Sequence, residues 1–267
     1  MKYFDAHAHV QFPMYDADRR EVLERMREEE VGALIVGVDE ASSKGALALL
    51  DEYAADIPDL YAAAGFHPNH AADGAFDERA FRALLKDPRV KAVGECGLDN
   101  YRPADADAVK PKQREVFEKH IQLALDADKP LMIHSRPFKG TQDAYRDLID
   151  ILTSYKREHG EKLRGDIHFF VGGVDEARDL IDLGFTLSFT AVLTFARDYD
   201  EVVRFAPLAS ILSETDAPYV APASRRGQRN DPLSVKDVVA AIAGIRAEDE
   251  ESVRRAILAN ATRLFRL

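Results

Sequence analysis

Short apolar runs and longer amphipathic stretches alternate along most of this 267-residue chain. The apolar runs predict strands, bounded by turn residues and polar stretches, over Tyr3–Asp5, Ala33–Val38, Tyr61–Gly65, Ala92–Gly94, Leu131–His134, Asp166–Phe169, Thr186–Ser188 and Ile211–Ser213. In the intervening stretches apolar residues recur every three or four positions, which is the period of an amphipathic helix. They predict helices over Asp18–Glu30, Ser42–Ala54, Asp77–Leu85, Pro111–Ala127, Gln142–His159, Val174–Leu183, Asp200–Phe205 and Ser234–Ile245.

Regular alternation of strands and helices indicates an α/β fold with parallel strand pairing through right-handed crossovers. Eight such units predict closure into a (β/α)8 barrel of the TIM type, and about 250 residues is the usual size of that domain. We therefore expect one barrel domain over residues 1–267. An open, doubly wound sheet is the alternative, because periodicity does not establish closure. A further helix is predicted over Glu248–Leu258, packed on the outside of the barrel.

The composition limits the partners and the compartment. Lysine and arginine number 36 and aspartate and glutamate 47, which gives 36 − 47 = −11, so nucleic acid would have to be bound by local basic groups and metal ions. The lone Cys96 excludes an internal disulfide and a cysteine zinc cluster, and it suits a reducing cytoplasm. Asp5, His7 and His9 interrupt the first apolar run. We expect no signal peptide, no membrane contact and a cytoplasmic location.

Residues with metal-binding side chains stand at the ends of the predicted strands. His7 and His9 are two positions apart, so on an extended strand both imidazoles lie on one face and can bind one ion. Glu95 follows the fourth strand, where Gly94 and Gly97 permit close approach of backbone and metal. A carboxylate has two oxygens, and binuclear hydrolases need such a bridge to hold two ions roughly 3.5–4 Å apart.

His134 and His168 occupy similar positions on two consecutive predicted strands. A single histidine on an apolar strand is more often a hydrogen-bonded core residue, but the pair favours a second metal. Asp216 follows the eighth strand, and Glu214, two residues earlier, is expected on the same face as an additional carboxylate. Such carboxylates can complete a metal shell or take a proton from water. Nitrogen and oxygen ligands suit Zn²⁺, Mn²⁺, Co²⁺ or Mg²⁺.

Four further side chains are candidates for binding substrate. Arg136 lies just beyond the fifth predicted strand, and Arg226 and Arg229 lie in the long final loop, Pro218–Pro232. A guanidinium fork matches the geometry of a phosphate group, so these arginines indicate phosphate binding on an otherwise acidic protein. His67 follows the third strand and is a candidate substrate contact, with a structural role in the loop as the alternative.

Taken together, these residues resemble the TatD family of metal-dependent deoxyribonucleases. The matching segments follow the family's order over nearly the whole chain: Asp5-Ala-His7-Ala-His9, Gly65-Phe-His67-Pro68, Gly94-Glu95-Cys-Gly97-Leu98-Asp99, Gln113, His134-Ser135-Arg136, His168-Phe169, Glu214-Thr215-Asp216-Ala-Pro218-Tyr219, Arg226-Gly-Gln-Arg229-Asn230 and Asn260-Ala-Thr-Arg263-Leu264-Phe265. Jointly they form a highly specific signature, although any single segment would not.

The resemblance implies an amidohydrolase-like barrel, that is, a metallo-dependent hydrolase fold, with two divalent metal ions. The first ion is held by His7, His9, Glu95 and Asp216, and the second by Glu95, His134 and His168. It also implies cleavage of DNA phosphodiester bonds, often in the 3′→5′ direction, with Asp216 and Glu95 as catalytic carboxylates. The expected substrate is single-stranded DNA or 3′ ends, and we expect a monomer.

The sequence departs from the family pattern in three places. The family commonly has His-Cys-Phe-Thr-Gly where this chain has His168-Phe169-Phe170-Val171-Gly172. The segments Asn100–Lys110 and Pro137–Gln142 are also atypical. All three flank the expected active face, so they bear on substrate preference more than on the metal site.

Two other functions remain open on the residues alone. The same metals polarise a carbonyl equally well, so a hydrolase of an ester, a lactone or a C–N bond could use this ligand set. Such a substrate would not need the arginines. A metal-dependent binding protein without catalytic activity is the second alternative, and open coordination positions argue against it, because structural metal sites are normally closed.

Overall fold

The computed structural model describes residues 1–267 except 54, 58, 72–75 and 102–105. Within that part of the chain the strands are β1 (Tyr3–Ala8), β2 (Val31–Val36), β3 (Leu60–Ala64), β4 (Val90–Asp99), β5 (Leu131–Arg136), β6 (Gly165–His168), β7 (Thr186–Phe189) and β8 (Ile211–Ser213). The helices are α1 (Arg19–Glu28), α2 (Glu40–Tyr53), α3 (Glu78–Leu84), α4 (Ala106–Ala127), α5 (Asp143–His159), α6 (Val174–Asp182), α7 (Asp200–Phe205), α8 (Val235–Arg246) and α9 (Glu250–Phe265).

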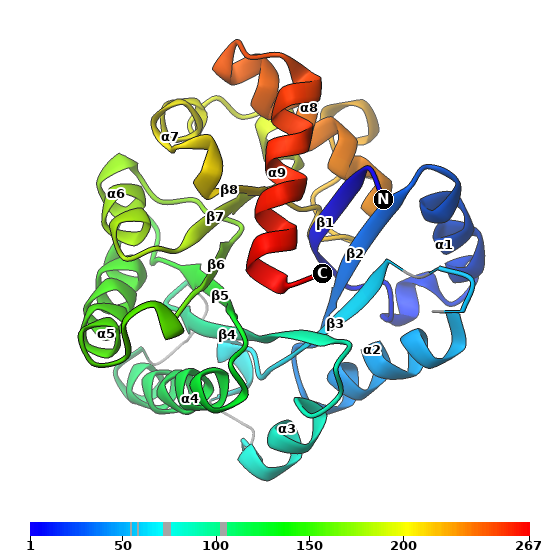
Figure 1. Cartoon of the computed structure of the whole chain (residues 1–267). Coiled ribbons are helices and arrows are strands. Elements are labelled where there is room, and N and C mark those ends of the chain that lie inside the picture. Colours follow the sequence, from blue (N-terminus) through cyan, green and yellow to red (C-terminus); the bar gives the residue numbers. More distant parts are fainter. Residues whose placement is uncertain (54, 58, 72–75, 102–105) are drawn as a thin grey trace.

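The strands form one eight-stranded parallel sheet in chain order, with helices around the outside (Figure 1). Just beyond β8 the chain returns to β1, where the His9 amide donates to the Ala217 carbonyl at 2.8 Å and the Asp216 amide donates to the His7 carbonyl at 2.9 Å. These bonds bring the first and last strands together into a nearly closed barrel. The predicted barrel is confirmed, and an open sheet is excluded.

Helix α9 does not pack on the outside of the barrel, as we had expected, but crosses the amino ends of the strands (Figure 1). Leu264 and Phe265 of α9 join a buried cluster with side chains of the barrel interior, including Phe4, Met132 and Leu212. The prediction was wrong because an amphipathic pattern shows that a helix has an apolar face but not which surface that face covers. The amino end of the barrel needs such a cover, and the carboxyl end is left for the site.

Strand β4 continues to Asp99, beyond the predicted end at Gly94, so Glu95 lies within the strand. Gly94 and Gly97 have φ angles of 150° and 137°. A Cβ atom at these positions would lie 2.2 Å from the Met132 carbonyl oxygen and 2.0 Å from the His134 carbonyl oxygen. The glycines therefore permit close approach of β4 to β5, rather than the close approach of backbone and metal that we had expected.

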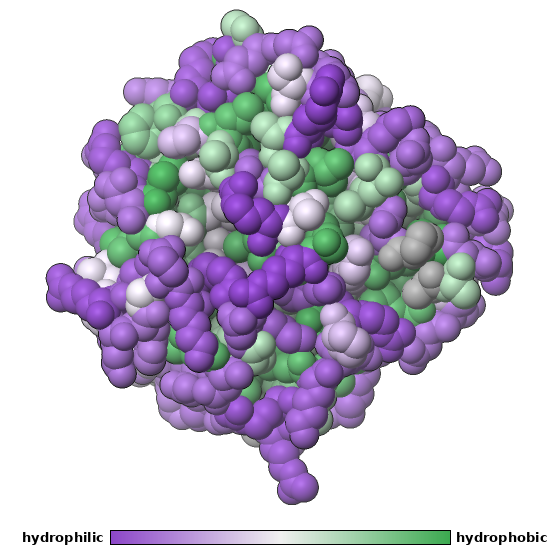
Figure 2. Space-filling model, viewed as in Figure 1, coloured by the Kyte–Doolittle hydropathy of each residue, from purple (hydrophilic) through white to green (hydrophobic). Residues whose placement is uncertain are grey.

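Hydrophilic residues cover most of the outer surface on the α9 side of the molecule, with hydrophobic residues showing in hollows between them (Figure 2). No helix in the described ranges is long and apolar enough to cross a membrane.

Candidate metal centre

Six predicted ligands meet at the carboxyl end of the barrel: His7, His9, Glu95, His134, His168 and Asp216. His7 Nε2 and His9 Nε2 face each other at 3.1 Å, and Glu95 Oε2 lies 3.4 Å from His7 Nε2. Asp216 Oδ1 lies 3.5 Å from His9 Nε2. Two ligand atoms on one tetrahedral ion, each about 2.1 Å from it, lie about 3.4 Å apart. The spacing of these atoms therefore fits a shared divalent cation.

Glu95 occupies the middle of this cluster, and its two oxygens face different histidines. Oε2 faces His7 and His9, whereas Oε1 lies 3.0 Å from His134 Nδ1 and 3.7 Å from His168 Nε2. The carboxylate is 4% exposed, so it is almost fully removed from solvent. This is the arrangement that a bridging carboxylate needs. Nitrogen atoms of His168 and His7 also lie near an oxygen of Asp216, so His168 can serve either side of the cluster.

Two of the imidazole rings are oriented by hydrogen-bond partners on the side that faces away from the cluster. Val36 O lies 2.7 Å from His9 Nδ1, and Asp99 Oδ2 lies 3.1 Å from His134 Nε2. Each contact favours a proton on the ring nitrogen that faces away from the cluster and leaves the other nitrogen for a metal. Asp99 belongs to a segment matched to the family, but we assigned it no role. A carboxylate four residues after Glu95 on an extended strand was the available signal.

Glu214 does not share a face with Asp216, which corrects our prediction. Its side chain is fully buried, with Oε1 2.8 Å from His168 Nδ1 and Oε2 bonded to the Ser188 hydroxyl at 2.7 Å. The strand alternation on which the prediction rested fails because β8 ends at Ser213, and Asp216 adopts a left-handed backbone with φ 53°. Glu214 therefore orients His168. It does not line the pocket, and it belongs to none of the groups of possible metal ligands found among the described residues.

Asp5, in the first strand, is bonded to the segment that follows the last strand, close to the candidate ligands. Its carboxylate accepts hydrogen bonds from the His7 amide, the Thr215 amide at 2.8 Å and the Thr215 hydroxyl at 2.5 Å. Burial raises the pKa of Asp5 well above its usual range, although these donors oppose the rise. Asp5 thus fixes the segment that carries His7 and His9 to the segment that carries Asp216.

His67 faces the same cluster as a hydrogen-bond donor. The Asn69 amide donates to His67 Nδ1 at 3.1 Å, so a neutral ring carries its proton on Nε2, which lies 3.3 Å from Glu95 Oε1. In this tautomer Nε2 can donate to a phosphate oxygen. In the other tautomer Nε2 would be a metal ligand, and His67, Glu95 and His134 do form one of the groups whose ligand atoms lie within 4.8 Å of one another. The geometry is thus compatible with the substrate contact that we predicted.

The pKa values of the buried side chains in the cluster indicate that metal binding releases a proton from the site. Burial would raise the pKa of Glu95, but the charges of His67 and His7 and a hydrogen bond from His134 hold it well below its usual range. Burial likewise opposes the charged form of His168, but Glu214 raises the pKa of that ring to about 10. Burial lowers the pKa of His7 to about 4, and the charge of the adjacent His168 ring adds to this effect. A bound metal ion must displace the proton of His168.

The structure brings one of the three predicted arginines to the metal pocket. Arg136 lines the pocket and stacks over Tyr101, with 4.0 Å from Cζ to the ring centroid. Arg229 instead forms two bonds with the carboxylate of Asp18, and Arg226 stacks over Phe195 at 3.8 Å. Neither lines the pocket. These two arginines do not reach the metal pocket because the loop that carries them turns away from it, apart from Tyr219 at its start.

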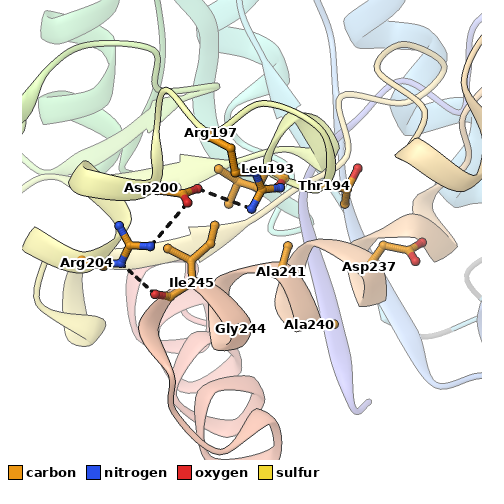
Figure 3. A pocket seen from close by; sticks show the side chains of 10 residues that line it. All are labelled: Leu193, Thr194, Arg197, Asp200, Arg204, Asp237, Ala240, Ala241, Gly244 and Ile245. Atoms are coloured by element: carbon orange, nitrogen blue, oxygen red, sulfur yellow. Dashed lines mark hydrogen bonds and ion pairs between the residues drawn. The ribbon is translucent and has the colours of Figure 1, made fainter.

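The metal cluster lies in a pocket of about 1430 Å³, whose lining also includes Asn69, Val192 and Tyr199. A smaller hollow of about 420 Å³ lies between α7 and α8 (Figure 3). Its arginines, Arg197 and Arg204, both contact Asp200. The smaller hollow holds no group of metal ligands among the described residues, so the larger pocket is the candidate functional site.

The sequence matches the family model of TatD-related DNases over residues 4–266. It is 37% identical over 268 residues to the uncharacterized metal-dependent hydrolase YabD of Bacillus subtilis, and the match covers 99% of each chain. It is 35% identical over 272 residues to the uncharacterized metal-dependent hydrolase TatD of Mycobacterium tuberculosis, covering 98% of this chain and 97% of that one. The crystal structure of YjjV, a TatD homologue from Escherichia coli K12, aligns with a TM-score of 0.87 at 26% identity, covering 100% of this chain and 98% of that chain.

Proposed function

Because this chain belongs to the TatD-related DNase family and is a metal-dependent hydrolase, we propose that it hydrolyses the phosphodiester bonds of DNA. The observation that carries the proposal is the position of Glu95, whose two oxygens face separate histidines at the base of an open pocket that Arg136 lines. The family resemblance supports 3′→5′ exonuclease action on single strands or 3′ ends.

The donor set supports two divalent ions that share Glu95. His7, His9 and Asp216 would hold one ion, and His134 would hold the other, with His168 able to reach either side. Bound divalent ions at such a site polarise a phosphate oxygen and lower the pKa of a coordinated water. Zn²⁺, Mn²⁺, Co²⁺ and Mg²⁺ are all compatible with nitrogen and oxygen ligands.

The side chains around the cluster have distinct tasks in this proposal. Asp216 is partly open to the pocket, and nearby histidines hold its pKa below the usual range despite burial. It is therefore a carboxylate at neutral pH, the form that can orient the attacking water and accept its proton. Arg136 and His67 donate to phosphate oxygens on the other side of the pocket. Asp99 and Glu214 keep His134 and His168 in place while the substrate binds.

The class of bond is tested with two small chromogenic substrates, bis(p-nitrophenyl) phosphate and p-nitrophenyl acetate. We expect hydrolysis of the phosphodiester with added Mn²⁺ or Zn²⁺, and loss of that activity in EDTA and in Glu95→Gln. The matched control is Glu161→Gln, because the Glu161 side chain is 94% exposed and lies outside the pocket. Turnover of the ester alone would favour a carbonyl hydrolase that uses the same ligands.

A further inference from the structure

Exposed aromatic side chains gather at the pocket that holds the metal ligands. Phe138, Tyr219 and Tyr101 are 56%, 49% and 47% exposed, and all three line this pocket. A single exposed ring is ordinary, but several exposed rings around one pocket are a feature of binding surfaces. Phe138 is the most exposed of the three, and it lies between β5 and α5 in Pro137–Gln142, one of the segments in which we find the sequence to depart from the family pattern.

The backbone around Phe138 is fixed by one carboxylate. Asp143 Oδ1 accepts from the Phe138 amide and from the Thr141 hydroxyl, both at 2.9 Å. The other oxygen, Oδ2, accepts from Lys110 Nζ at 2.9 Å, which ties the segment to α4. Phe138 therefore lies in a segment whose backbone is held in place by Asp143 and Lys110. A residue whose backbone is already fixed loses less entropy when a flat partner stacks on its ring.

Positive charge lies beside this ring in a protein of net charge −11. Arg136, Lys139 and Arg146 line the same side of the pocket, and none of the three forms an ion pair within the ranges that the structure describes. The carboxylates that line the pocket are Glu95, Asp99, Asp198 and Asp216. Glu95, Asp99 and Asp216 each face a histidine of the metal cluster, and Asp143, outside the lining, is paired with Lys110. Unpaired cations next to an exposed ring can hold the phosphates on either side of a stacked base.

The pocket is large enough for a polymeric substrate. Its volume of about 1430 Å³ exceeds the roughly 300–1000 Å³ of a typical small-molecule site. The metal ligands occupy its base, so space remains for nucleotides on either side of the bond that is cut.

We propose that Arg136, Phe138, Lys139 and Arg146 form a stacking ledge that binds an unpaired nucleobase and its phosphates beside the scissile bond. This inference rests on the proposed function and names the residues that would bind the single strand. In a duplex both faces of each internal base are covered by its neighbours, so a base can stack on Phe138 only when it is unpaired and splayed out.

The test compares Phe138→Ala with the matched control Phe205→Ala, because Phe205 is 39% exposed on α7 and does not line the pocket. The first readout is the ratio of kcat/KM on a 5′-labelled single-stranded oligothymidylate to kcat/KM on bis(p-nitrophenyl) phosphate. We expect Phe138→Ala to lower this ratio about tenfold, which corresponds to about 1.4 kcal/mol. Phe138→Trp restores it, and Phe205→Ala leaves it at the wild-type value.

The second readout is fluorescence anisotropy of the labelled oligothymidylate with metal-free protein, which needs no cleavage. We expect Kd to rise about tenfold in Phe138→Ala and a blunt duplex to bind more weakly than the single strand. If wild type binds in a Phe138-dependent way but does not cleave, the ledge stands and the proposed function fails. If it cleaves the strand and Phe138→Ala matches Phe205→Ala in both readouts, the ledge is overturned and the proposed function stands. Failure of wild type to bind the single strand, or equal binding of the duplex, also overturns the ledge.

Discussion

Replacing Glu214 with glutamine separates the charge behind His168 from the hydrogen bonds that hold it. Glu214 Oε1 lies 2.8 Å from His168 Nδ1 and accepts from the Phe169 amide at 2.8 Å. A glutamine carbonyl oxygen in that place accepts from the Phe169 amide and faces His168 Nδ1 as the carboxylate oxygen does, and the amide nitrogen faces the Ser188 hydroxyl, which can accept. Glu214→Gln therefore removes one buried negative charge and keeps the local geometry.

The consequence is a change in how metal affinity depends on pH. Glu214 outweighs the effect of burial and raises the pKa of His168 to about 10, so in the wild type this ring gives up a proton to the solvent when a metal binds below that pH. Its contribution is a tenfold rise in affinity per pH unit, about 1.4 kcal/mol each. Without the charge, the pKa of His168 falls toward its ordinary value, and this contribution ends at a lower pH.

The assay is a competition titration of Zn²⁺ against a chelator at pH 7, 8 and 9. We expect the wild-type affinity to rise about 100-fold more than that of Glu214→Gln between pH 7 and pH 9, from one additional displaced proton over two pH units. Glu161→Gln is the surface control, and the thermal midpoint checks that the variant is folded. Equal slopes for wild type and Glu214→Gln would refute the assignment of Glu214 to His168.

Three further predictions follow from the same structure. Arg136→Ala lowers kcat/KM on a phosphodiester by about tenfold or more, since a charged hydrogen bond to the substrate is lost. Arg229→Ala leaves kcat/KM within twofold of wild type, because Arg229 is bonded to Asp18. Steady-state kinetics of both variants check this. Phe265→Ala lowers the free energy of unfolding by about 3–5 kcal/mol in urea titration, because the ring is 1% exposed in the cluster where α9 meets the barrel; a loss below about 1 kcal/mol would contradict that packing. His120 is buried, and burial lowers its pKa from 6.5 to about 4. The unfolded chain therefore binds this proton first, and the free energy of unfolding falls as pH drops from 6.5 to 4, by up to about 3.4 kcal/mol. Urea titrations at pH 7 and 4.5 should show this loss in wild type and a smaller one in His120→Gln.

The clustering of the candidate metal ligands could be predicted from sequence because each lies on a strand or within three residues of its end, where position along the chain determines position in space. The spacing of His7 and His9 places both rings on one face, and the structure puts their Nε2 atoms 3.1 Å apart. The same rule failed for Glu214, since the left-handed backbone at Asp216 interrupts the alternation, and no sequence pattern indicated that conformation.

Features that depend on packing between distant segments were beyond the sequence. The pairing of Arg229 with Asp18 joins residues 211 positions apart, and the placement of α9 depends on contacts with several strands. The roles of Asp99 and Asp5 likewise become visible only when their partners, His134 and Thr215, are seen beside them. Part of the atypical segment Asn100–Lys110, residues 102–105, lies outside the described residues.

The central claim, a nuclease built on a metal centre that Glu95 bridges, is tested most directly by digestion of a 5′-labelled single-stranded oligonucleotide with Mg²⁺, Mn²⁺ or Zn²⁺. The account predicts a ladder that shortens from the 3′ end with at least one of these metals and disappears in EDTA and in Glu95→Gln. An intact oligonucleotide under every metal condition, or a ladder that persists in Glu95→Gln, would contradict it.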